Sequence, residues 1–331
     1  MTTPPSGTTV TDSDDVLWWK SYYIEKLQTS DRVVGSVLIL AILVGLLGNG
    51  SAVCYFWSRR KRTIHDLLYL AITTVDFLTV LLVIPVVLPL FNYRYSMLFK
   101  SKVFCTACAS VIMFTARMSM FLAMMICITR TIAMKCPNRI LSRFWVIGVI
   151  VGYATYMLVI YLIYLPQRWQ YGEYYFHLSS CILETLDFTT TKAIFATYFG
   201  MISFAVELTL PSLITFVCFV VSTRVLMTRP ALNNETDKRI RRVSVTISIF
   251  TAVFLALNIP CFLYQIWEIL GALSILPFDS EIFDVIDVVY LYLQFMLQFF
   301  PIYLNAAINP LLYLLRMRGY QNWIRQALKR T

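Results

Sequence analysis

The chain has 331 residues, of which 59% are hydrophobic and 14% are charged. A soluble domain is usually about 45–50% apolar and about 25% charged, so this chain has too little charged surface to coat a water-soluble globule. Its net charge of +10 is divided among several loops, which argues against a nucleic-acid-binding surface and indicates a membrane topology signal instead.

Long apolar segments follow one another along the chain, each close to or above the roughly 20 residues that a helix needs to cross a bilayer. Lipid offers the backbone no hydrogen-bond partners, so these segments are predicted to be helices, and the ten-residue alternation of a β-barrel is missing. The sequence therefore predicts an all-α, seven-transmembrane helix bundle over residues 33–315. The predicted spans are Val33–Trp57, Leu67–Phe91, Phe104–Met134, Phe144–Leu165, Ala193–Met227, Val243–Leu270 and Val288–Leu315.

Polar segments flank the predicted bundle. Residues 1–32 carry Asp12, Asp14 and Asp15 and are predicted to be an extracellular N-terminus. No secretory signal is visible in them, so the first span is expected to act as the targeting signal. Residues 316–331 are predicted to form a short amphipathic eighth helix and a cytoplasmic tail.

The orientation follows from the basic residues, which recur in alternate connections. Arg59–Arg62, Lys238–Arg242 and the basic tail fall on one side, which the positive-inside rule makes cytoplasmic. The opposite side carries acids such as Glu268 and Asp284. The chain is therefore expected to be a multi-pass plasma-membrane protein with an extracellular N-terminus.

Two of the eight cysteines lie at the predicted outer face, Cys105 at the start of span three and Cys181 after span four. Outer faces are oxidising, so a disulfide is expected between them. Cys105-Thr-Ala-Cys108 is formally a CxxC, but no second pair and no nearby histidine accompany it, so it is a weak zinc or redox signal.

Polar residues inside apolar spans are energetically expensive, so each one calls for an explanation. They occur in a fixed order: Asn49 in Gly48-Asn49-Gly50, Asp76 in span two, Thr129-Arg130-Thr131, Pro211, Pro260, and Asn309-Pro310-Leu311-Leu312-Tyr313. Together with the spacing from Cys105 to Arg130, this set resembles the rhodopsin-like family of G-protein-coupled receptors over Val33 to Arg330.

The resemblance implies an allosteric sodium site in the middle of the bundle. Asp76 matches the family's span-two carboxylate, Ser119 its span-three hydroxyl, and Asn305 and Asn309 its span-seven amides. A buried carboxylate needs a cation or a proton, so a polar cluster around a protonated Asp76 stays open as the alternative. No other cofactor is expected.

The resemblance also implies that Arg130 and Tyr313 serve coupling to a heterotrimeric G protein. The family's activation switch maps onto Phe254, Asn258, Pro260, Asn309 and Pro310. Two departures matter. Thr129 stands where the family usually has an acid that restrains the arginine, which predicts raised basal signalling. Asn258 replaces an aromatic rotamer switch, and its amide is expected to join the Asp76 cluster.

Two charges fall at mid-bilayer height on neighbouring spans. Arg117 is thirteen residues before Arg130, roughly 20 Å along a helix, and Glu207 is one turn before Pro211. Because neither charge is tolerable alone in lipid, an Arg117–Glu207 ion pair is predicted at the floor of a ligand pocket. The alternative is that either residue lines a wet cavity. The other expected ligand contacts are Tyr175, Gln265, Glu268 and Tyr303.

Two features of the sequence argue against particular classes of ligand. Span seven has no lysine for a retinal Schiff base, and Ile112 replaces the aspartate of amine receptors. Trp169–Cys181 is predicted to form a β-hairpin, and an acidic outer surface favours a basic or amidated peptide. The chain is similar to invertebrate neuropeptide receptors of the FMRFamide-receptor type. A chemosensory receptor or a transporter is the alternative. An enzyme is not expected, since His65 and His177 are the only histidines and no catalytic motif is present.

Overall fold

The computed structural model describes residues 12–60, 62–91, 102–136, 141–171, 174–175, 182–183, 205–228, 245, 248–249, 251–263, 266 and 300–329.

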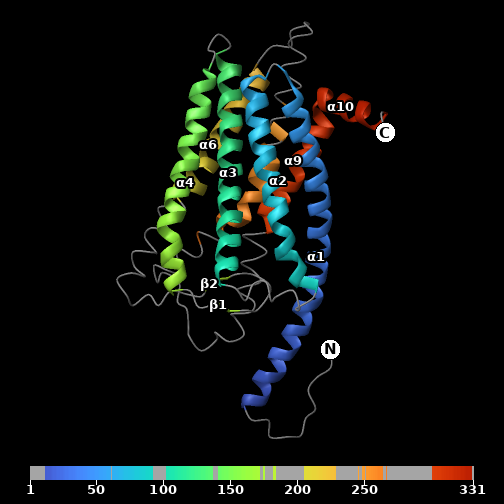
Figure 1. The fold of residues 1–331 in the computed structure, drawn as a ribbon, viewed down its shortest axis with the longest axis vertical. Helices are drawn as coiled ribbons and strands as arrows, with labels where there is room; N and C mark the ends of the chain where they lie inside the picture. The colour runs from blue at the N-terminus through green and yellow to red at the C-terminus, as the bar shows by residue number, and fades with distance from the viewer. Residues whose placement is uncertain are drawn as a thin grey trace.

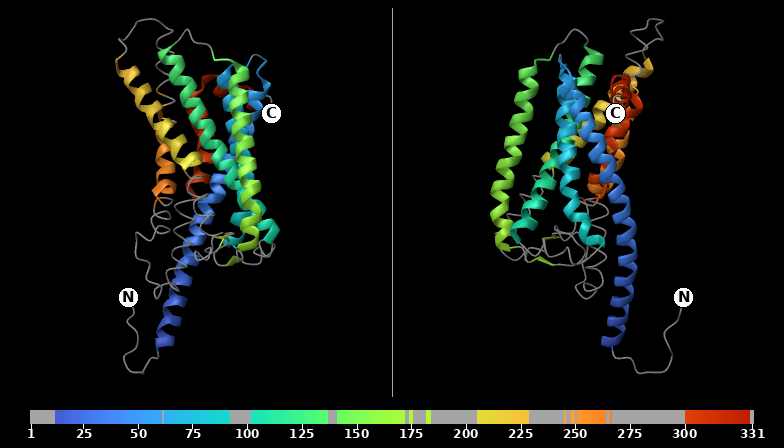
Figure 2. Two further views of the ribbon diagram at one scale, coloured as in Figure 1. Left: turned by 90° about the vertical axis from the view of Figure 1, so that its left-hand side faces the viewer. Right: turned by 45° about the vertical axis from the view of Figure 1, so that its right-hand side comes forward.

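Long helices lie side by side as a bundle, and a short final helix turns away across one end (Figures 1 and 2). The start of α1 lies at the opposite end of the bundle from that final helix, as expected for an odd number of crossings (Figure 1). The helices are α1 (Asp12–Ser58), α2 (Ile64–Phe91), α3 (Lys102–Lys135), α4 (Arg143–Tyr171), a π-helical turn η2 (Ala205–Thr209) that continues into α6 (Leu210–Thr228), a helix over Thr251–Leu263, α9 (Phe300–Arg316) and α10 (Arg318–Leu328).

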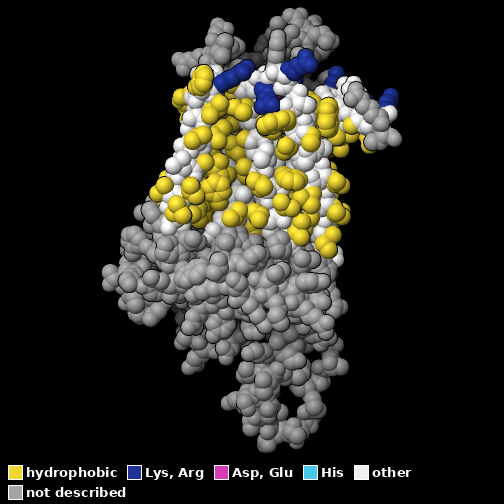
Figure 3. All heavy atoms as spheres, viewed as in Figure 1, with side chains coloured by type: hydrophobic (Ala, Val, Ile, Leu, Met, Phe, Trp, Pro, Cys, Tyr) yellow, Lys and Arg dark blue, Asp and Glu magenta, His cyan; other side chains and the backbone are white. Residues whose placement is uncertain are grey.

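Within these described ranges, five helices are long and apolar enough to cross a membrane, and two shorter apolar helices accompany them. Their outward faces carry large apolar side chains, such as Leu47 (75% exposed) and Phe144 (86% exposed). Figure 3 shows these side chains as a band over the described face, with Lys and Arg gathered at the end that carries α10. This surface suits lipid, with water only at its ends.

Most predicted spans are found, but their boundaries differ. The first helix begins at Asp12 and not at Val33, because hydropathy marks only the lipid-facing part of a helix that continues beyond the bilayer. Acids at the start of that extension, such as Asp12 and Asp14, favour a helix N-terminus. The eighth helix is present as α10. The first part of the predicted fifth span (residues 193–204), both ends of the predicted sixth span and the first part of the predicted seventh span (residues 288–299) lie largely outside the described residues.

The predicted outer hairpin is present as a two-residue ladder. Strand β1 (Tyr174–Tyr175) pairs antiparallel with β2 (Ile182–Leu183), with Tyr174 opposite Leu183. The second strand begins just after the predicted stretch ends at Cys181. The disulfide expected between Cys181 and Cys105 lies outside the described residues.

Helix α3 forms the centre of the bundle, packed against α2, α4 and α6. Its side chains Leu122, Met125 and Ile126 are almost fully buried and form one apolar core with Phe254 and residues of α1 and α2. Helix α4 is held at the side, where Tyr153 stacks on Phe121 of α3 at a centroid distance of 3.9 Å. The central position of α3 brings its polar residues into contact with several neighbouring helices.

Helices α1 and α9 approach each other very closely at Gly48. A Cβ at this position would lie 2.4 Å from Pro310 Cβ, a distance that real contacts do not reach. The next residue, Asn49, is fully buried and donates from Nδ2 to the Ala306 carbonyl at 2.9 Å. The Gly48-Asn49 pair therefore fixes the start of the bundle against its last span.

Candidate functional site: buried polar groups along helix α3

A fully buried carboxylate joins three helices in the middle of the bundle. Asp76 of α2 accepts a hydrogen bond from Ser119 Oγ of α3 at 2.7 Å and one from Asn309 Nδ2 of α9 at 2.5 Å. The structure thus brings together three of the four residues expected around sodium. A carboxylate and neighbouring hydroxyl and amide oxygens are hard ligands of the kind that alkali and alkaline-earth cations take.

The fourth expected residue, Asn305, is buried on α9 one turn before Asn309. Asp76 has no hydrogen bond to Asn305 in the described part of the chain, where Ser119 and Asn309 are its partners. Asn305 is therefore near the cluster along the helix, while the direct bonds to the carboxylate come from Ser119 and Asn309.

Arg117 and Glu207 lie together at the interface of α3 and η2. Arg117 Nε is 3.9 Å from Glu207 Oε2, and the two side chains are 12% and 2% exposed. Glu207 sits in the π-helical turn, a widened turn that often occurs at functional sites and that here precedes Pro211. Arg117 Nη1 is buried and has no hydrogen-bond partner in the described ranges, so one donor of the guanidinium is not used there.

The remaining expected ligand contacts are more dispersed. Tyr303 is buried on α9 and lines a small apolar recess toward α1 and α2, with Leu38, Ala41, Ile42 and Val80. That interface differs from the one that holds Arg117 and Glu207. Tyr175 lies in β1, and its side chain, together with Gln265 and Glu268, lies outside the described residues.

At the α10 end of the bundle, Arg130 of α3 is partly buried, and its Nε has no hydrogen-bond partner among the described residues. Neither described ion pair involves it. Thr129 Oγ1 donates to the Ile126 carbonyl of its own helix at 3.1 Å and offers Arg130 no charge. Asp237, the acid nearest the start of the predicted sixth span in the sequence, lies outside the described residues. In the described part of the chain, Arg130 is thus held without a carboxylate.

Tyr313 lies buried among aromatic rings at the same end. Its ring contacts Tyr69 edge-on at 5.5 Å and Phe56 at 6.0 Å, and its hydroxyl has no hydrogen-bond partner within the part of the chain that the structure describes. A buried hydroxyl without a hydrogen-bond partner raises the free energy of this arrangement. A rearrangement of the bundle that lets the Tyr313 hydroxyl reach a polar group would therefore be favoured.

The sixth-span switch residues are present, with one difference from expectation. Phe254 is buried in the core, and Asn258 is buried one turn later. The Asn258 amide donates to the Phe254 carbonyl at 2.7 Å and does not join the hydrogen bonds of Asp76. The acceptor is a backbone carbonyl of its own helix. Pro260 lies in the same helix, and Pro310 lies inside α9 against Gly48.

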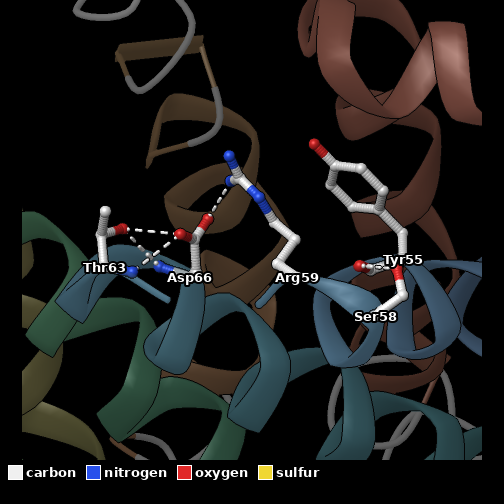
Figure 4. A network of polar contacts seen from close by, with 5 residues as sticks. All are labelled: Tyr55, Ser58, Arg59, Thr63 and Asp66. Carbon is white, nitrogen blue, oxygen red and sulfur yellow. Dashed lines mark hydrogen bonds and ion pairs between the residues drawn. The ribbon is translucent and has the colours of Figure 1, made fainter. Parts of the chain in front are cut away.

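A group of hydrogen bonds between the end of α1 and the start of α2 was not predicted from the sequence (Figure 4). Asp66 is buried and accepts from Arg59 Nη1 at 2.5 Å and from the Thr63 backbone N–H at 2.9 Å. The Thr63 hydroxyl caps the Asp66 N–H in return at 3.2 Å. The Thr63-x-x-Asp66 spacing is a capping-box signal that marks the start of α2. Arg59 therefore has a fixed structural partner in addition to its place in the basic loop.

A second missed contact docks α10 on α1. Tyr320 is buried, and its hydroxyl lies 2.6 Å from Ser51 Oγ and 3.3 Å from the Gly48 carbonyl. Burial raises the pKa of Tyr320, so the hydroxyl stays protonated at neutral pH and remains a donor. Its ring also packs edge-on against Tyr55. Gly48 therefore lets α9 approach closely because it has no Cβ, and its carbonyl accepts a hydrogen bond from α10.

The chain matches the family model of the seven-transmembrane receptors of the rhodopsin family over residues 48–313. A comparison with curated proteins gives no match. The matched range begins at the Gly48–Asn49 contact in the first span, includes Asp76, Arg117 and Arg130, and ends at Tyr313 in α9, so it covers most of the chain. The predicted seven-helix membrane fold is thereby confirmed. The chain belongs to the rhodopsin family of seven-transmembrane receptors.

Proposed function

We propose that this G-protein-coupled receptor binds an extracellular peptide and activates a heterotrimeric G protein at the end of the bundle that carries α10. One observation supports this proposal above the others. The Arg117–Glu207 pair and the Asp76–Ser119–Asn309 cluster both involve the central helix α3. The same helix carries Arg130, which forms no ion pair with a carboxylate among the described residues.

Helix α3 connects these groups mechanically. Arg117 and Ser119 lie on it near mid-bilayer, and Arg130 lies roughly 20 Å further along the helix. A ligand that draws Arg117 away from Glu207 shifts α3 against η2 and α6, and the same shift acts on the bond from Ser119 to Asp76. The ion pair and the Ser119–Asp76 hydrogen bond each have two states, formed and broken, so they can act as two-state switches. Ligand binding at one end thus biases the position of Arg130 at the other.

The buried cluster suits a sodium ion as a negative regulator. Asp76, Ser119, Asn305 and Asn309 would hold the ion, whose positive charge compensates the carboxylate and favours the arrangement in which the three helices stay joined. No further cofactor is proposed.

Peptide binding is supported by the outer surface and the hairpin. The outer connections carry Glu268, Asp279, Glu281 and Asp284, which attract a basic or amidated peptide by charge. The β1–β2 hairpin supplies a rim of aromatic sequence. A small chemosensory ligand is the second candidate, favoured by the deep burial of Arg117 and Glu207, because a compact molecule reaches such a pair more easily than a chain end does.

The test is second-messenger output in cells that express the receptor, recorded as calcium and as the rise and fall of cAMP, with a library of short amidated peptides. A response lost in Arg130→Ala supports the proposal and identifies the coupling. Arg143→Ala is the matched control, because Arg143 is an exposed arginine that begins α4 at the same end. Basal output without any peptide response favours the chemosensory reading. Silence throughout, with the protein shown at the cell surface, contradicts coupling.

A further inference from the structure

The Arg117–Glu207 ion pair leaves hydrogen-bonding capacity unused at the interface of α3 and η2. Arg117 Nε is 3.9 Å from Glu207 Oε2, whereas hydrogen-bonded charged groups are about 2.7–2.9 Å apart. Arg117 Nη1 is buried and has no hydrogen-bond partner among the residues that the structure describes. A buried donor without a partner raises the free energy of the site, so an acceptor that reaches this donor is bound favourably.

Tyr153 of α4 brings a second donor to the same interface. Its ring stacks on Phe121 of α3, which holds the side chain against the central helix. Its hydroxyl is buried without a hydrogen-bond partner in the described ranges, and it lies close enough to Arg117 and Glu207 to interact with both electrostatically. A guanidinium and a phenol hydroxyl, each able to donate, therefore lie beside one carboxylate.

The charges of this interface already balance, which limits the kind of group that can enter it. Asp66 and Asp76, the other buried acids in the part of the chain whose side chains are described, are bonded to partners of their own. A ligand carboxylate would add a second negative charge beside Glu207, and a ligand ammonium would add a second positive charge beside Arg117. Either would leave one buried charge in excess, which is energetically expensive.

We propose that Arg117, Glu207 and Tyr153 together recognise a neutral primary carboxamide of the ligand. The carboxamide oxygen accepts from Arg117 Nη1 and from the Tyr153 hydroxyl, and the carboxamide nitrogen donates to the Glu207 carboxylate. Each polar group gains a partner, and the net charge of the interface does not change. The inference rests on the proposed function, in which a ligand separates Arg117 from Glu207, and it names the chemical group that does so. The C-terminal amide of a peptide and a small carboxamide both present this group.

The test measures binding to the purified full-length receptor, without G protein, as the rise of the thermal midpoint with probe concentration. One arm uses a library of short peptides, each made as the C-terminal carboxamide, the free acid and the methyl ester. The other arm uses benzamide, benzoate and methyl benzoate. In at least one arm the carboxamide should bind about tenfold to a hundredfold more tightly than the other two forms. The acid brings an excess buried charge, and the ester has no N–H to donate to Glu207.

Glu207→Gln should reverse this preference. The variant removes the negative charge, so the Arg117 guanidinium can pair with a ligand carboxylate, and the free acid should bind about tenfold more tightly than the carboxamide. Asp66→Asn is the matched control, because it removes an ion-paired acid at the α10 end of the bundle, and it should keep the preference for the carboxamide. If Glu207→Gln does not fold, the comparison of the three chemical forms on the native receptor decides by itself.

Equal binding of the three forms in both arms, tighter binding of the acid to the native receptor, or no binding of any probe would overturn the carboxamide site. Peptides that bind whatever their C-terminal group would remove the site and leave the proposed peptide receptor standing. A preference for benzamide without any peptide binding would keep the site and exclude a peptide as the source of the carboxamide. Because the measurement involves no signalling, neither result depends on coupling to a G protein.

Discussion

Asn309 of α9 donates to the Asp76 carboxylate of α2 at 2.5 Å, a contact that joins residues 233 positions apart in the chain. If the cluster around it holds sodium, the ion stabilises the receptor by about 1.4 kcal/mol when its concentration is ten times Kd. The thermal midpoint should therefore rise in sodium chloride relative to choline chloride, and Asp76→Asn should remove this difference.

Ser119→Ala is a smaller change to the same cluster, because it removes one proposed sodium ligand and leaves the Asp76 carboxylate in place. Its response to sodium should be weaker than that of the native receptor but not absent. A native receptor that melts equally in both salts would favour the proton over sodium as the partner of Asp76.

The Arg117–Glu207 pair predicts a cost for removing either charge alone. Leaving one buried charge without its partner costs about 3–5 kcal/mol, although the separation of 3.9 Å points to the lower end. Glu207→Arg and Arg117→Glu should each reduce surface expression and thermal stability. The double change restores opposite charges and should recover part of both. No recovery in the double variant would rule out direct pairing.

The missing Cβ of Gly48 predicts a strong effect from a single methyl group. Gly48→Ala pushes that methyl into Pro310, and overpacking of this kind typically costs 1–3 kcal/mol. Gly148→Ala on α4 is the control, since a Cβ there meets nothing within 4 Å and alanine is the better helix former. Thermal melting should separate the two variants. Equal midpoints would mean that α1 and α9 can move apart at little cost.

Thr129 predicts how Arg130 is restrained. Its hydroxyl is bonded to the Ile126 carbonyl and carries no charge. Thr129→Asp places a carboxylate next to the arginine and should lower basal second-messenger output severalfold, while the response to a saturating agonist persists. Thr129→Ser is the control, because it keeps the hydroxyl without adding charge. Basal output that is undetectable in the native receptor would contradict the weak restraint inferred from Thr129.

Much of this architecture is accessible from sequence because lipid leaves the chain few options. Apolar segments must be helices, so the spans could be predicted, and the cost of charge in lipid identified Asp76, Arg117 and Glu207. What hydropathy could not give was the start of α1 at Asp12, since it measures the bilayer and not helix length. It also could not give the hydrogen-bond partner of Asn258, because an amide has nearby acceptors on its own helix as well as across the bundle.

The contacts at the α10 end were the least predictable from sequence. Arg59 was interpreted only as part of a topology signal, yet it bonds Asp66, whose capping pattern with Thr63 was readable. Tyr320 gave no local signal, because its partners Ser51 and Gly48 are about 270 residues away. Side chains that dock one helix on a distant one depend on the finished arrangement of helices, which local patterns do not encode.

The ring and the hydroxyl of Tyr320 make separate contacts, so their contributions to stability can be measured separately. Tyr320→Phe keeps the ring against Tyr55 and Trp323 but removes the bonds at Ser51 and the Gly48 carbonyl. The loss should be about 1 kcal/mol, and amide exchange should speed up in α10 while α3 is unaffected.

Burial raises the pKa of Tyr320 above its ordinary value of 10.0, so the hydroxyl's contribution is complete below pH 10. It fades as pH rises through the raised pKa, because ionisation is harder in the folded state than in the unfolded state. Native receptor and Tyr320→Phe should therefore differ by a constant amount from neutral pH up to pH 10, and a difference that already shrinks near neutral pH would show that the hydroxyl is not buried at Ser51.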